Sequence, residues 1–141
     1  MSAISVTDLP FNRFIGLQPA EAPQLLQLPA GEQYLNHLGT VHASAQLALA
    51  EAASGEYLLR HFGTAGGLVP LVRRLEAKFR RPASGSISAS VTATTPDLEV
   101  LRTALAAKGR AIISIVVSVQ DGSGQQTLTA EVEWFIASAP G

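Results

Sequence analysis

The amino-acid sequence predicts an α+β fold in which an antiparallel sheet packs against one long helix. Apolar and polar residues alternate in several separate stretches, which is the pattern of strands that bury one face and expose the other. Residues 41–60 are instead dense in alanine and leucine, which favour helix. Because the chain offers no other large apolar surface, we expect the sheet to lie across this helix.

The first third of the chain leads into the long helix. Residues 8–23 contain three prolines and predict an irregular lead-in with at most a short helix at 11–15. Residues 23–30 predict a short strand, and Thr40 is a plausible N-cap for the long helix that follows. Three glycines are expected to end that helix: Gly63, Gly66 and Gly67.

Two strands are predicted next, within 71–82 and 84–96, and they meet at the sequence Pro-Ala-Ser-Gly. In the first strand, apolar and charged side chains alternate as a half-exposed strand requires. The apolar set is Leu75, Ala77 and Phe79, and the charged set is Glu76, Lys78 and Arg80. The second strand has one face made of Ile87, Ala89, Val91 and Ala93.

The last third predicts a helix and two more strands. Residues 97–108 form the helix, with Asp97 near its start and Gly109 at its end. The β-branched run 111–120 predicts a central strand, which an Asp-Gly-Ser-Gly turn joins to a final strand at 126–138. One face of the final strand contains Leu128, Ala130, Val132, Trp134 and Ile136.

Composition limits the classes of function. A chain of 141 residues has the size of one ordinary domain, so we expect a single domain over 1–141. Only 15% of the residues are charged, against about 25% typically, which favours a surface buried between subunits. The net charge of −1 argues against nucleic acid or a membrane as partner. Cysteine, a signal-peptide pattern and a membrane-spanning stretch are absent, so we expect a cytoplasmic protein.

The most informative stretch surrounds the start of the long helix. Asn36 and His42 stand in a polar turn, and Glu51 follows nine residues after the histidine among small apolar residues. Ala43 and Ser44 lie in the first helical turn, where unpaired backbone N–H groups suit a carbonyl oxygen that becomes an oxyanion. The alternative is an ordinary helix start that any polar group could satisfy.

Glu51 is the candidate base of this stretch. Its own helix offers no basic partner one turn away, and apolar surroundings raise the pKa of a carboxyl group. The alternative is a solvated surface glutamate. We expect His42 to orient the loop rather than to act as acid or base. Asn36 would hold the attacking water or the substrate carbonyl, or serve only as a turn residue.

The order of elements resembles the hotdog fold, an antiparallel sheet wrapped around one long central helix, over residues 24–138. The opening segment is similar to the acyl-CoA thioesterases related to the phenylacetate-pathway enzyme. Their pattern is Asn, five residues, His-Gly-Gly, then an acid nine residues beyond the His. Here Asn36, His42 and Glu51 stand at those spacings, with His-Ala-Ser in place of His-Gly-Gly. Residues 79–85 resemble the family's second-to-third strand turn, and the long 97–108 helix resembles an uncharacterised thioesterase-like branch.

A basic cluster offers a binding site for the phosphates of coenzyme A, because arginine forks match phosphate oxygens. We assign substrate binding to Arg74, Lys78, Arg80 and Arg81, with Arg73 beside them. The equally favoured alternative is a solvated strand that discourages edge pairing. Lys108 and Arg110 are a second candidate. Nucleic acid is less favoured because Phe79 is the only aromatic residue within the cluster.

The resemblance and the residues together predict hydrolysis of an acyl-CoA thioester. Water attacks the carbonyl carbon, the oxygen rests on the N–H of Ala43 or Ser44, and Glu51 acts as general base or, through an anhydride, as nucleophile. Coenzyme A enters as part of the substrate, so we expect no separate cofactor, and the histidine spacings predict no metal.

Two other functions stay open at this point. A non-catalytic acyl-CoA-binding or scaffold protein is the main alternative, and the His-Ala-Ser sequence favours it. A hydratase or dehydratase is less favoured because the Asp-x-x-x-x-His motif of that branch is absent.

The predicted site requires a second subunit. Ala43 and Glu51 are eight residues apart, which is about 12 Å along one helix, so one carbonyl group cannot contact both. Two antiparallel helices across a two-fold axis would bring the N-terminus of one to the middle of the other. We therefore expect a homodimer, or a dimer of dimers forming a homotetramer, with active sites between subunits.

Overall fold

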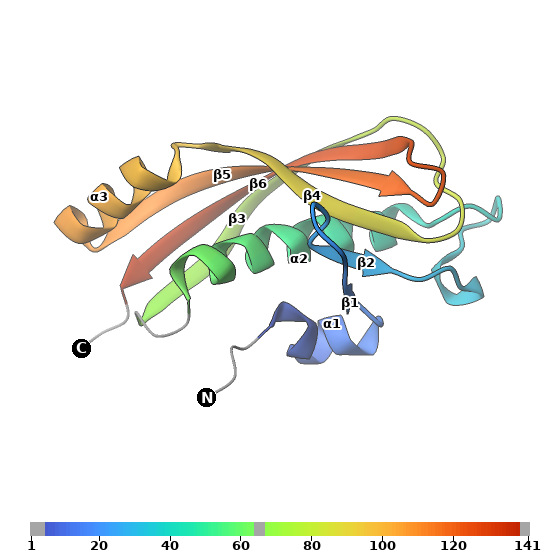
Figure 1. Ribbon diagram of the computed structural model, residues 1–141, viewed down its shortest axis with the longest axis horizontal. Helices are drawn as coiled ribbons and strands as arrows, with labels where there is room; N and C mark the ends of the chain where they lie inside the picture. Colours follow the sequence, from blue (N-terminus) through green and yellow to red (C-terminus); the bar gives the residue numbers. More distant parts are fainter. Residues whose placement is uncertain (1–4, 64–66, 139–141) are drawn as a thin grey trace.

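The computed structural model describes residues 5–63 and 67–138, which contain six antiparallel strands in one curved sheet (Figure 1). The strand order across the sheet is β1-β2-β4-β5-β6-β3. The strands are β1 (Gln18–Pro19), β2 (Leu26–Leu28), β3 (Leu68–Phe79), β4 (Ile87–Thr95), β5 (Arg110–Asp121) and β6 (Gln126–Ser138). The long helix α2 (Ala43–Phe62) runs along one face of the sheet, so the predicted α+β architecture is confirmed.

The shorter helical segments either precede α2 in the chain or lie between β4 and β5. They are the 3₁₀ turns η1 (Val6–Asp8) and η2 (Glu32–Tyr34), and the helices α1 (Pro10–Phe14) and α3 (Leu98–Lys108). The predicted caps of α3 are confirmed, because the Asp97 side chain accepts a hydrogen bond from Val100 N–H (3.0 Å) and Gly109 has a φ of 71°. No helix within the described residues is long and apolar enough to cross a membrane.

The start of α2 differs from the prediction. The helix begins at Ala43, and His42 rather than Thr40 is its N-cap. Thr40 cannot serve because its N–H and hydroxyl groups are bonded to the Asn36 side chain in the preceding turn. The helix closes as predicted at Gly63, whose N–H donates to the Leu59 carbonyl (2.7 Å). The proposed stop at residue 66 lies outside the described residues.

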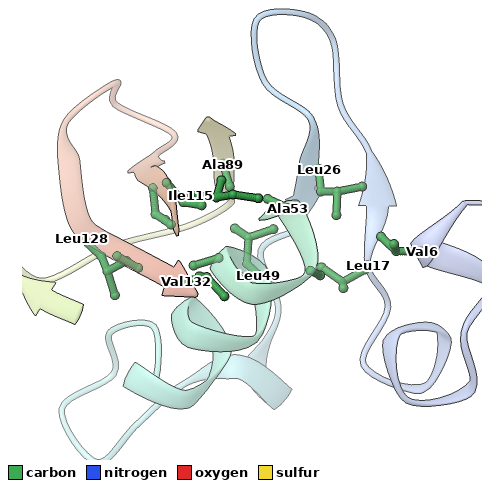
Figure 2. Close-up of a cluster of buried hydrophobic side chains, with 14 of the residues drawn as sticks. Val6, Leu17, Leu26, Leu49, Ala53, Ala89, Ile115, Leu128 and Val132 are labelled. Carbon is green, nitrogen blue, oxygen red and sulfur yellow. The ribbon is translucent and has the colours of Figure 1, made fainter. Parts of the chain in front are cut away.

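The core is formed between α2 and the inner face of the sheet (Figure 2). Leu49 and Ala53 project from α2 toward Ile115 and Val132, and none of these four side chains is exposed. The small alanines let the helix backbone approach the strands closely. The predicted inner face of β6 is confirmed, since all five of its residues are buried: Leu128, Ala130, Val132, Trp134 and Ile136.

Strand β3 is a long edge strand, which pairs with β6 alone within the described residues. It does not pair with β4, so residues 80–86 are a crossover and not a hairpin turn. The prediction of one buried face is wrong for this strand, because α2 covers the central strands but not the β3 edge. Phe79, opposite the fully buried Leu128 on the inner face, is 47% exposed.

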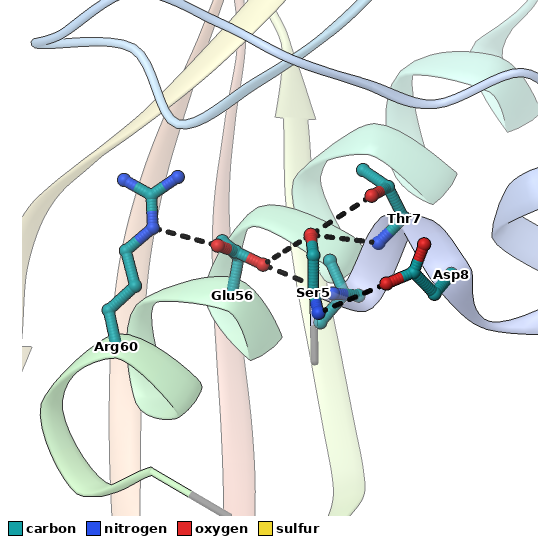
Figure 3. A network of polar contacts seen from close by, with 6 residues as sticks. Ser5, Thr7, Asp8, Glu56 and Arg60 are labelled. Carbon is teal, nitrogen blue, oxygen red and sulfur yellow. Dashed lines mark hydrogen bonds and ion pairs between the residues drawn. The ribbon is translucent and has the colours of Figure 1, made fainter. Parts of the chain in front are cut away.

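The N-terminal segment is fastened to the second half of α2 by a buried carboxylate (Figure 3). Glu56 accepts hydrogen bonds from Val6 N–H and the Ser5 hydroxyl, both at 3.1 Å, and pairs with Arg60 at 2.7 Å. The Asn12 side chain donates to the Val6 carbonyl (3.0 Å). These bonds satisfy the buried charge and hold α1 beside the central helix.

Candidate active site

The turn before α2 is shaped by the Asn36 side chain. Its Oδ1 accepts hydrogen bonds from the N–H groups of Leu38 (2.9 Å) and Thr40 (3.1 Å), while Nδ2 donates to the Thr40 hydroxyl (2.9 Å). The half-buried asparagine therefore acts as a turn residue in the single chain. Its Nδ2 carries a second hydrogen that these bonds do not use.

His42 holds the beginning of α2 with two hydrogen bonds, one from its backbone N–H and one to its side chain. Its N–H donates to the Tyr34 carbonyl (2.7 Å), and its Nδ1 accepts the Ser44 N–H (3.0 Å). This geometry gives the imidazole an orienting, helix-capping part. The Ala43 N–H is left without an acceptor among residues 5–63 and 67–138. Ala43 and Ser44 are the two predicted N–H donors to an oxyanion. The Ser44 N–H is bonded to His42, whereas the Ala43 N–H is open, meaning that it has no acceptor among the described residues.

The first turns of α2 adjoin an apolar hollow of about 540 Å³. Its walls come from α1, η2 and one face of α2. They contain Phe11, Phe14, Ile15, Leu28, Tyr34, Leu35, His42, Ser44, Ala45 and Ala48. Phe14 is 88% exposed on this wall, so a large aromatic surface faces solvent in the single chain.

A second hollow, the basic hollow, has a volume of about 330 Å³ and reaches the same helix start from the side of the β3–β4 crossover. Its lining contains Asn36, Leu38, Thr40, Ala43, Gln46, Phe79, Arg80 and Arg81. The hydrogen bond from Val41 N–H to the Ala83 carbonyl (2.9 Å) ties the crossover to the beginning of α2. Two arginines therefore line the hollow that Ala43 also lines, and their guanidinium groups donate to the Thr129 hydroxyl (Arg80 Nε, 3.1 Å) and to the Gln125 side-chain oxygen (Arg81 Nη1, 3.0 Å).

Glu51 lies in the middle of α2 with a half-buried side chain. Burial raises the pKa of its carboxyl group above the ordinary value of 4.5. Its carboxylate forms no hydrogen bond or ion pair within the part of the chain that the structure describes. Ala48, one turn earlier on the same helix face, lines the apolar hollow. The carboxylate is therefore unpartnered, and it shares a helix face with that hollow.

The structure divides the basic cluster into two groups. Arg80 and Arg81 lie beyond the end of β3 and line the basic hollow. Arg74 and Lys78 are on the outer face of the sheet, away from α2, where Arg74 pairs with Glu76. In a continuous strand, alternation would place Arg74, Lys78 and Arg80 on one face, but β3 ends at residue 79, so Arg80 is not part of the strand.

One functional candidate was missed by the sequence reasoning. Gln46 is only 3% exposed, yet it lines the basic hollow, and its Oε1 accepts the hydroxyl of buried Thr127 (2.8 Å). The sequence contained an indication of this residue, because Gln46 is a polar residue on an otherwise apolar helix face. That face also contains the buried Leu49, Ala50 and Ala53. Only the fold brings Thr127 and the hollow to it.

The curved antiparallel sheet and the central helix whose N-terminus adjoins both hollows define a hotdog-fold protein. The profile of DUF4442, a domain of unknown function, matches residues 13–136, and the chain belongs to this family. The sequence has no significant match among curated proteins.

Solved structures share the fold over most of the chain. A protein of unknown function and probable thioesterase from Pseudomonas aeruginosa is 26% identical, with a TM-score of 0.80 over 94% of this chain and 91% of its own. A thioesterase from Haemophilus influenzae is 16% identical, with a TM-score of 0.73 over 96% and 88%. A Bacillus halodurans protein solved with CoA is 18% identical, with a TM-score of 0.61 over 79% and 65%.

Proposed function

We propose that the protein hydrolyses acyl-CoA thioesters that carry a hydrophobic acyl group. The observation that carries this proposal is the position of the first turn of α2 between an apolar hollow and a basic hollow. An acyl-CoA has one apolar arm and one phosphate-bearing arm, joined at a thioester carbonyl. Ala43 lines the basic hollow, and its neighbours His42 and Ser44 line the apolar hollow, so the open Ala43 N–H suits the carbonyl oxygen.

The comparisons support the same reaction class. Two of the similar structures bear the name thioesterase, one of them only as probable, and a third was solved with CoA. The arginines of the basic hollow support a phosphate-bearing leaving group, since guanidinium groups bind phosphate oxygens in pairs.

The proposed reaction adds one water to the thioester. The Glu51 carboxylate accepts a proton from water as the new C–O bond forms, and the negative charge moves to the carbonyl oxygen beside Ala43 N–H. The C–S bond then breaks as the C=O bond re-forms. The leaving thiolate takes the proton from Glu51, so the products are the carboxylic acid and the thiol of CoA.

Completion of the site requires a second copy of the chain. Ala43 and Glu51 of one helix are about 12 Å apart, too far for one carbonyl group to meet both. The long β3 edge and the exposed Phe79 on its inner face support association there, because long edge strands with apolar faces are normally covered. We propose a homodimer whose antiparallel α2 helices pair the Ala43 end of one subunit with Glu51 of the other.

A thioester panel tests the proposal. Purified protein should hydrolyse acyl-CoAs with apolar chains, and CoA thioesters should have a lower KM than matched thioesters of a short thiol lacking the nucleotide. Binding of acyl-CoA without turnover would favour the non-catalytic alternative, which the His-Ala-Ser sequence at residues 42–44 supports. The absence of both binding and turnover would remove the proposed function.

A further inference from the structure

The Gln46 side chain has a donor group that no residue in 5–63 or 67–138 uses. The residue is 3% exposed, and its Oε1 accepts the Thr127 hydroxyl at 2.8 Å. That hydroxyl has a single hydrogen, and its other contact, to the Val119 carbonyl, is longer at 3.4 Å. The short contact assigns Oε1 to Thr127, which leaves Nε2 as the free end of the amide.

The free end of Gln46 opens on the basic hollow. Gln46 and Ala43 both line that hollow, and they are three residues apart on one face of α2. Long side chains of a helix lean toward its N-terminus, which directs the amide toward the first turn. Gln46 Nε2 has no partner in the described residues, yet it is not fully enclosed by protein. The one fully enclosed side-chain polar atom without a partner there is Gln24 Oε1.

We propose that Gln46 Nε2 is a second donor to the thioester carbonyl oxygen, beside the Ala43 N–H. The Nε2 donor is not fully enclosed and is unused within the described residues, so a carbonyl oxygen bound in the hollow can accept a hydrogen bond from it. Thr127 is then a positioning residue, because its hydroxyl holds the amide oxygen and turns Nε2 toward the substrate. This inference rests on the proposed function and adds a side-chain donor to the single backbone N–H that α2 presents.

A carbonyl oxygen fits the two donors better than a phosphate group does. Ala43 N–H and Gln46 Nε2 are neutral donors from α2, whereas the guanidinium groups of Arg80 and Arg81 are charged and come from the segment after β3. Neutral preorganised donors stabilise the charge that develops on an oxygen during acyl transfer. The guanidinium groups are left for the distant phosphates of the same substrate.

Steady-state kinetics provide the first test. Gln46→Met keeps the length of the side chain and removes the donor, so kcat should fall by about 10²-fold or more with little change in KM. Gln126→Met, the same change at an exposed position beside Thr127, is the matched control and should keep the wild-type kcat. Thr127→Val should lower kcat less, and adding it to Gln46→Met should cause no further loss. A folded Gln46→Met variant with the wild-type kcat overturns the proposal.

An infrared measurement provides a second test that does not depend on turnover. It also does not depend on the folding of Gln46→Met alone, because it includes a Thr127→Val variant. An acyl-CoA with a ¹³C-labelled thioester carbonyl is bound to Glu51→Gln, and the carbonyl band is compared with those in Glu51→Gln/Gln46→Met and Glu51→Gln/Thr127→Val. Loss of the donor should move the band to higher frequency in both double variants. An unmoved band overturns the role of Gln46.

The two measurements separate this inference from the proposed function. If the wild-type protein binds the thioester but does not hydrolyse it, the proposed function fails, and the band shift still decides the role of Gln46. If no thioester binds, both fall together. If turnover is normal but the band does not move, the hydrolase stands and Gln46 is not a donor to the carbonyl oxygen.

Discussion

Glu51 combines a thermodynamic cost with its proposed role as general base. Its half-buried carboxyl group has a raised pKa because burial disfavours the charged form, and no partner among the described residues offsets that cost. The folded chain therefore binds the Glu51 proton more tightly than the unfolded chain does. Stability must fall as the pH rises from the ordinary value of 4.5 through the raised pKa.

Glu51→Gln should separate these two effects. The amide cannot accept a proton from water, so kcat should fall about a hundredfold or more, while the melting temperature at neutral pH should rise because a buried charge is removed. The gain in stability should vanish below pH 4.5, where wild-type Glu51 is protonated in both states. Thermal melts of both proteins across this pH range check the prediction, and an equal melting temperature at neutral pH contradicts it.

The pH profile of the wild-type enzyme follows from the same pKa. A general base must be ionised, so kcat/KM should decline as the pH falls through the Glu51 pKa, at a pH above 4.5. The residual activity of Glu51→Gln should lack this acidic limb. A limb that persists unchanged in the variant would belong to another group.

The two halves of the basic cluster predict different kinetics. Arg80→Ala/Arg81→Ala removes the guanidinium groups of the basic hollow, so KM for acyl-CoA should rise while kcat changes little. Arg74→Ala/Lys78→Ala acts on the outer face of the sheet and should raise KM much less. Both pairs are measured on acyl-CoA and on a short thioester without the nucleotide. Equal effects of the two pairs would place the phosphates elsewhere.

Element boundaries show what a local pattern can predict. The caps of α3 and the inner face of β6 follow from residues adjacent in sequence, and both predictions are confirmed. The start of α2 was missed by two residues, because a histidine is a less common cap than threonine and Asn36 already engages Thr40. The exposure of β3 was missed because alternation does not reveal whether a helix covers that strand.

His42→Ala tests the cap at the start of α2. Loss of the bond from Ser44 N–H to Nδ1 should lower the free energy of unfolding by about 1 kcal/mol. His42→Asn, which restores a capping side chain, should recover most of that loss. Denaturant unfolding of the three proteins makes the comparison. An unchanged midpoint for His42→Ala would show that the imidazole does not stabilise the helix.

The hotdog fold as a whole could be predicted from the sequence, but the two hollows could not. Each hollow joins residues from distant segments, such as Phe11 with Ala48 and Ala43 with Arg80. No local spacing contains that information. Asn36, His42 and Glu51 were found because they lie within one short stretch, whereas Gln46 depends on Thr127 from the far end of the chain.

Assembly is the property of the whole molecule that the activity should require. Leu71→Lys/Val72→Lys puts charge on both faces of the β3 edge, so the protein should sediment as a folded monomer and lose thioester hydrolysis. Val100→Lys, an exposed position on α3, is the matched control and should keep the assembly. A wild-type monomer that hydrolyses thioesters would contradict the shared site.

The fastening of the N-terminal segment by Glu56 has an evolutionary consequence (Figure 3). The anchor lies in the second half of α2, whereas Phe11 and Phe14 reach the apolar hollow at the other end of the helix. Mutations in α1 can therefore reshape one wall of the apolar hollow, while Ala43, Gln46 and Glu51 belong to the separate helix α2. Under the proposed function, substrate preference and bond cleavage would therefore depend on separate segments of the chain and could change independently.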